Sequence, residues 1–200
     1  MTPEQLKLIA PNCPDAEKWS SCIRQAANEF AIEEGRDMAA FVATLSHESL
    51  DFTHLEENLN YSAQRLMQVW PRRFPDIDSA NACAHNPQSL AEKVYGGRMG
   101  NEPGTGQAFK FRGRGPIQIT GRVNYAACSK ALYSDQTLLD DPDLLLTPED
   151  GSRSSGWFWA HMGLSEISDF KKVTLMVNGG TVGYADRLAR FNNALRVLGA

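Results

Sequence analysis

The sequence lacks a surplus of basic residues. Its 200 residues include 20 Lys and Arg against 24 Asp and Glu, which gives a formal net charge of −4 and an isoelectric point of about 5.6. Because phosphate binding usually depends on a basic surplus, this balance excludes nucleic acid as the main partner. It also provides no long-range attraction to an anionic cell surface.

Cysteine is scarce, with four widely separated residues and no CxxC pair. This pattern excludes a disulfide scaffold and a structural zinc knuckle. We expect buried thiols at all four positions, because free cysteine is often buried. The alternative for Cys13 and Cys22 is a bridge formed in an oxidising compartment.

Long hydrophobic runs are also missing. No apolar stretch approaches the ~18 residues of a membrane-spanning helix, and the N-terminus has no basic stretch followed by an apolar one. We therefore expect no membrane span and no standard signal peptide, so the chain is made in the cytosol. Because no apolar surface stripe is evident, we expect a monomer.

The residues that are present predict a mainly α fold with a small β element. Apolar positions recur at helical spacing in most of the chain. We expect a single domain over 1–200, with a helical segment of about 1–35 packed on it. The expected helices are 3–9, 15–34, 37–48, 63–70, 87–95, 121–132, 147–163, 166–177 and 183–198. Their expected N-terminal caps include Asp15, Ser62, Asn86 and Thr147.

Three other segments have distinct patterns. Residues 50–60 are predicted to form an irregular hairpin or loop, and 116–120 ("PIQIT") a short strand. Residues 96–116 contain seven glycines and two prolines, which predicts a long, extended loop. Such loops inside compact domains are usually functional. Trp157 and Trp159 lie on an apolar helix and are expected in the core.

Ionisable residues concentrate in 46–62, "SHESLDFTHLEENLNYS", which has four carboxylates and two histidines. A zinc site, a solvated charged turn and a catalytic acid/base pair are the three interpretations. His47-Glu48 begins like the zinc motif HExxH, but Asp51 stands where the second histidine is required. We therefore expect neither a metal nor another cofactor.

The acid/base interpretation rests on two glutamates in different surroundings. Glu48 ends an apolar helix, where the helix dipole and partial burial oppose ionisation and favour a general acid. Glu57 lies in a more polar stretch, where a carboxylate stays ionised and can act as a base. Spacing alone does not distinguish Glu57 from Glu56 or Asp51, and a charged surface turn remains possible.

Several motifs together resemble glycoside hydrolase family 19. They are "HES", "ENLNYS", "YGGRMGN", "FRGRGPIQITGRVNY" and "VNGG" followed by "ADR", and the resemblance extends over about residues 19–198. Within the family, the chain is more similar to compact bacteriophage endolysins than to chitinases. The resemblance implies a two-lobed, lysozyme-like fold with a cleft between the lobes. It also implies hydrolysis of β-1,4 bonds between N-acetylated amino sugars with inversion.

The resemblance also implies roles for single residues. Glu48 corresponds to the general acid, Glu57 to the general base, and Thr120 to the residue that holds the attacking water. An inverting enzyme keeps its two carboxyl groups about 6.5–9.5 Å apart to admit that water. The residues implied in sugar binding are Tyr61, Gln118, Asn124, Asn178 and Arg187. Many family members have Gly-Gly after the first motif, whereas this chain has Ser49-Leu50-Asp51.

The substrate is not specified by these motifs, because chitin and peptidoglycan share the same type of linkage. The phage resemblance, with no secretion signal and no chitin-binding module, favours the glycan strands of peptidoglycan. We expect a bacteriolytic endolysin that is made in the host cytoplasm and reaches the cell wall and periplasm through a holin-type pore, causing host cell lysis. A chitinase is the alternative, and a wall amidase or peptidase or a non-catalytic sugar-binding protein are more distant ones.

Overall fold

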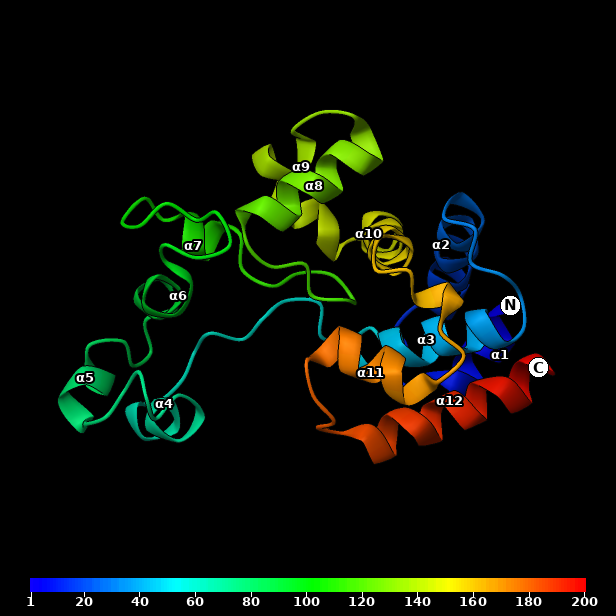
Figure 1. Ribbon diagram of the computed structural model, residues 1–200, viewed down its shortest axis with the longest axis horizontal. Coiled ribbons are helices and arrows are strands. Elements are labelled where there is room, and N and C mark those ends of the chain that lie inside the picture. Colours follow the sequence, from blue (N-terminus) through cyan, green and yellow to red (C-terminus); the bar gives the residue numbers. More distant parts are fainter. The chain divides into compact units, whose positions relative to one another are not determined.

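The computed structural model describes residues 1–200, and the chain forms two compact units. The first unit consists of Met1–Leu55, Arg114–Gln118 and Asp143–Ala200. The second consists of Glu56–Gly113 and Ile119–Pro142. Figure 1 shows the helices in order along the chain.

The helices confirm the mainly α class. Those of the first unit are α1 (Pro3–Ile9), α2 (Ala16–Glu29), α3 (Arg36–Glu48), α10 (Pro148–His161), η2 (Leu164–Glu166), α11 (Phe170–Asn178) and α12 (Tyr184–Leu198). Those of the second unit are α4 (Ala63–Val69), α5 (Ile77–Asn81), α6 (Pro87–Tyr95), α7 (Gln107–Lys110), α8 (Arg122–Tyr133) and α9 (Thr137–Asp140). A 3-10 helix, η1 (Pro142–Leu146), follows α9.

The predicted helix starts are confirmed at their caps. The side chains of Asp15, Ser62, Asn86 and Thr147 each accept a hydrogen bond from the backbone N–H three residues later. These bonds satisfy amides that have no partner inside the helix, which is why short polar residues determine where a helix begins.

The predicted strand at 116–120 is wrong. Residues 115–118 form turns. The extended backbone is limited to isolated bridge positions at Glu56, Arg114 and Ile119. Gln118 has φ +59°, a left-handed conformation that is incompatible with a strand. The segment 96–116 is also less extended than expected, because it contains α7. The short helices α5, α7 and α9 were missed because four or five residues give too little periodicity.

The first unit is built around α3, which packs against α12, while α2 packs against α10 (Figure 1). Trp159 is fully buried, as expected, and its ring meets Phe41 edge-on at 5.3 Å. Its Nε1 donates to Asp37 Oδ1 at 2.9 Å. Trp157 is only half-buried and stacks on His161 at 5.2 Å.

The second unit has its own apolar core, which runs from the end of the acidic segment through α4, α5 and α6 to α7. Its buried members are Leu59, Ala63, Leu66, Phe74, Ala80, Cys83, Leu90, Ala91, Val94 and Ala108. All four cysteines of the chain are buried and unbridged, which confirms their expected state.

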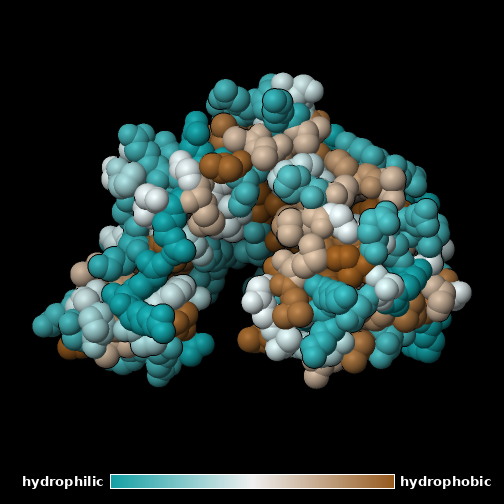
Figure 2. Space-filling model, in the orientation of Figure 1, coloured by the Kyte–Doolittle hydropathy of each residue, from teal (hydrophilic) through white to brown (hydrophobic).

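Hydrophilic side chains cover much of the face seen in Figure 2, with smaller hydrophobic areas between them. Single exposed apolar residues are ordinary on protein surfaces. None of the helices combines the length and the hydrophobicity needed to cross a membrane.

The two tryptophans of α10 provide a matched stability test. We expect Trp159→Phe to lower the free energy of unfolding by about 2–3 kcal/mol, because it leaves a cavity and removes the donor to Asp37. Trp157→Phe should cost less than about 1 kcal/mol, since its ring is partly exposed. Urea denaturation measures both, and equal losses would contradict this assignment of the core.

Candidate active site

The first unit contains Glu48, the last residue of α3. Its side chain is 20% exposed, and Oε1 accepts a hydrogen bond of 2.5 Å from Arg187 Nη1. Arg187 lies on α12 and is itself buried, with its Nε left without a hydrogen-bond partner. From the resemblance, Arg187 was expected to bind sugar. The structure instead pairs it with Glu48.

Two further ion pairs join the end of α3 to α12. His47 Nδ1 lies 2.6 Å from Asp186 Oδ2, and Arg190 Nη1 lies 2.5 Å from Asp51 Oδ1. Burial opposes ionisation of Asp51 and Asp186, but hydrogen bonds outweigh it and lower the pKa of each. For Asp51 the donors are Ser46, Arg190 and the Asn12 backbone; for Asp186 they are His47 and Arg190.

The second unit contains Glu57, which is half-buried. The Tyr95 hydroxyl donates to its Oε1 at 2.5 Å, and the Gly113 N–H donates to Oε2 at 3.3 Å. Burial, followed by the hydrogen bond to Glu57, raises the pKa of Tyr95 well above its usual value, so the phenol keeps its proton and remains a donor. Tyr95 was not among the expected site residues, because a contact between residues 38 positions apart leaves no local pattern in the sequence.

The neighbouring Glu56 is held differently. It forms an ion pair with Arg112, whose guanidinium lies over the Phe109 ring at 4.1 Å. A cavity of about 330 Å³ opens beside these groups. Its lining residues are Glu56, Glu57, Asn58, Leu59, Asn60, Pro87, Phe109 and Arg112. Glu57 therefore borders an open space within its own unit, whereas Glu56 is tied to a cation.

The remaining predicted residues of the second unit are Thr120, Asn124 and Tyr61. Asn124 is exposed at the start of α8, and its Nδ2 donates to the Thr120 carbonyl at 2.8 Å. Tyr61 is half-buried and meets Trp70 edge-on at 5.4 Å. Their roles at the sugar stay predictions.

Gln118 and Asn178 belong to the first unit, and both shape loops. Gln118 Nε2 donates to the Gly115 carbonyl at 3.0 Å. Asn178, the last residue of α11, is exposed, and its amide approaches the Gly180 and Val182 carbonyls at 3.4 and 3.5 Å. Sugar binding by these two amides likewise stays a prediction.

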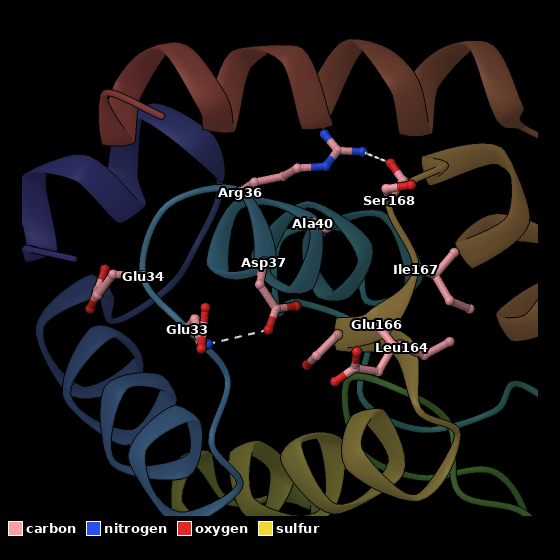
Figure 3. A pocket seen from close by; sticks show the side chains of 10 residues that line it. Glu33, Glu34, Arg36, Asp37, Ala40, Leu164, Glu166, Ile167 and Ser168 are labelled. Atoms are coloured by element: carbon pink, nitrogen blue, oxygen red, sulfur yellow. Dashed lines mark hydrogen bonds between the residues drawn. The ribbon is translucent and has the colours of Figure 1, made fainter.

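A second cavity in the first unit, of about 300 Å³, has no predicted site residue in its lining (Figure 3). Two of its charged side chains already have partners. Asp37 accepts from the Glu33 backbone at 3.2 Å and from Trp159, and Arg36 donates to the Ser168 carbonyl. These contacts make the cavity part of the packing at the start of α3.

Comparisons with known proteins agree with this architecture. Residues 24–174 match the family model of glycoside hydrolase 19, described as chitinase class I. A glycosyl hydrolase family 19 domain-containing protein of Haemophilus influenzae is 37% identical over 150 residues, covering 74% of each chain. Endochitinase 1 of Theobroma cacao is 30% identical over 126 residues, which are 62% of this chain but only 32% of that protein.

Solved structures show the same fold. Chitinase C of Streptomyces griseus superimposes with a TM-score of 0.66 at 19% identity, covering all of this chain and 92% of that one. A structure described as a bacterial family 19 chitinase gives the same TM-score at 16% identity.

The chain therefore belongs to glycoside hydrolase family 19. It is a glycoside hydrolase of the chitinase type, with the mainly helical, lysozyme-like fold of that family.

The lowered pKa of Asp51 predicts how stability depends on pH. A depressed pKa in the folded state contributes stability above the unfolded pKa of about 3.9, and this contribution is lost as the pH falls toward the folded value. We expect Asp51→Asn to lower the free energy of unfolding by about 1–3 kcal/mol at pH 7. The deficit should shrink below about pH 4 in chemical denaturation. A deficit that stays constant from pH 7 to pH 3 would contradict it.

Proposed function

We propose that this chain is an endolysin that hydrolyses β-1,4 bonds in the glycan strands of bacterial peptidoglycan by an inverting acid/base mechanism. It is made in the cytoplasm of an infected bacterium, reaches the wall through a holin-type pore, and lyses the cell. The observation that carries the proposal is the contrast between the partners of Glu48 and Glu57.

Glu48 serves as the general acid and protonates the oxygen of the leaving sugar as the glycosidic bond breaks. Arg187 supports this step, because its guanidinium stabilises the negative charge that develops on Glu48 as the proton leaves.

Glu57 serves as the general base and takes a proton from the attacking water, which bonds to the anomeric carbon and inverts it. Tyr95 and the Gly113 amide donate to its two oxygens, which fixes the carboxylate plane. Thr120 orients the water, since a hydroxyl both donates and accepts. Gln118, Asn124, Asn178 and Tyr61 bind the sugars.

Peptidoglycan is supported by the resemblance of the sequence motifs to those of compact bacteriophage endolysins. Chitin is the second candidate, because the relatives named for an activity are chitinases. Both substrates present the same bond to Glu48 and Glu57, so the mechanism is common to the two readings.

The test is digestion of purified peptidoglycan and of chitin oligosaccharides by the wild type, Glu48→Gln and Glu57→Gln. Products are read by mass spectrometry with reducing-end labelling. We expect new reducing ends from peptidoglycan, and a loss of 10²-fold or more in both variants. Glu56→Gln, one residue away and paired with Arg112, should keep at least a tenth of the activity.

Each result decides a different point. Turnover of chitin alone would assign the chitinase function and reject the endolysin role. Release of peptides with intact glycan would reject glycosidase action on the wall. A larger loss in Glu56→Gln than in Glu57→Gln would exchange the proposed base.

A further inference from the structure

An unusual turn follows α3 immediately after the proposed acid. Leu50, Asp51 and Phe52 have φ angles of +47°, +60° and +65°, so three consecutive residues with side chains adopt the left-handed conformation. Only glycine, and to a lesser degree Asn and Asp, adopts it readily, because the Cβ crowds the next carbonyl oxygen. Leu50 is also 55% exposed, so burial of its own side chain does not hold the turn.

Phe52 is buried and packs on Trp19 at 4.7 Å, and the side chain of Asp51 fixes the centre of the turn. Asp51 is 2% exposed, and its two oxygens accept four hydrogen bonds. Oδ1 accepts from Ser46 Oγ at 2.7 Å and from Arg190 Nη1 at 2.5 Å, and Oδ2 from Asn12 Nδ2 at 3.0 Å and Asn12 N at 3.3 Å. A carboxylate with this many donors, one of them a cation, is fixed in position and orientation.

Two of the three residues that donate to Asp51 lie outside the part of the chain that matches the family model. That match covers residues 24–174, whereas Asn12 precedes it and Arg190 follows it on α12. The turn is therefore stabilised by contacts that the shared family segment does not contain. It is also the place where this chain has Ser49-Leu50-Asp51 in place of the glycine pair found in many members.

Arg190 belongs to the same helix as the partner of the acid. Asp186, Arg187 and Arg190 bond in turn to His47, Glu48 and Asp51, and Arg190 Nε also donates to Asp186 at 2.8 Å. The last turn of α3 and the left-handed turn after it are thus fixed to one face of α12. Glu48 lies between the two outer contacts.

We infer that Asp51 and Arg190 are positioning residues for Glu48. The inference rests on the proposed function, since it assumes that Glu48 is the acid. Asp51 touches no substrate in this role. It fixes the end of α3 against α12, so that the Glu48 carboxyl keeps its orientation and its hydrogen bond from Arg187. Small displacements of a catalytic group are costly, and about 1 Å can lower a rate 10²-fold.

The test compares Asp51→Asn, Asp51→Gly and Arg190→Gln in the full chain, with kcat and KM measured on whichever glycan the wild type cleaves. We expect kcat to fall about 10- to 100-fold in all three while KM stays within about twofold. Asp51→Gly separates two explanations, because glycine adopts the turn without strain but offers Arg190 no acceptor. The double variant Asp51→Asn with Arg190→Gln should be no slower than the slower single variant.

A matched control removes a different ion pair of the same unit. Arg153 donates to both oxygens of Glu29 at 2.8 Å, which joins α10 to α2. Glu29→Gln should lower the melting temperature while kcat is unchanged. All rates are taken below the melting temperature of the least stable variant, so that loss of folding does not contribute.

The outcomes separate this inference from the proposed function. Wild-type kcat in Asp51→Gly would show that only the backbone conformation matters and would overturn the inference. A fall in kcat of equal size in Glu29→Gln would assign Asp51 a merely structural role and would overturn it too. If Glu48→Gln keeps its activity, the assignment of the acid fails first, and the positioning role fails with it.

Discussion

The ion pair between Glu48 and Arg187 is the interaction on which the junction of α3 and α12 in the first unit depends. A carboxyl at the C-terminus of a helix faces the negative end of the helix dipole, so its charged form needs a compensating cation. Arg187 is almost completely buried, and a buried guanidinium in turn needs an anion. Each residue therefore requires the other, and this requirement fixes α12 against the end of α3.

In the second unit, the carboxyl of Glu57 is held by neutral hydrogen-bond donors. Glu57 accepts from the Tyr95 phenol and the Gly113 amide, neither of which has a net charge. Glu48, by contrast, faces the buried guanidinium of Arg187. The two carboxyls therefore differ in the charge of their partners rather than in their residue type.

Sequence reasoning could predict the features that local pattern determines. Helices with an apolar stripe and a polar cap were found at their starts, as for α10 behind Thr147 and α2 behind Asp15, although α2 ends at Glu29 rather than at the expected residue 34. The strand at 116–120 failed because the β-branched residues of "PIQIT" suggested extension, whereas Gly115 and the left-handed Gln118 produce a turn.

The partners of the site residues could not be predicted in the same way. Arg187 and Arg190 are 139 residues away from the carboxylates that they bind, and Tyr95 is 38 residues away from Glu57. Such pairs arise from tertiary packing, and one sequence carries no record of them. The glutamates themselves were found because the acidic segment is local and its motifs resemble those of the family.

The buried thiols provide a way to follow local unfolding of the protein. Cys13 and Cys22 lie in the first unit, and Cys83 and Cys128 in the second. Burial raises the pKa of Cys13, Cys22 and Cys83, so in the folded state these thiols are both shielded and weakly nucleophilic. Each unit therefore has two native reporters, and the rate at which a thiol reagent modifies each pair records the separate opening of each unit without any added label.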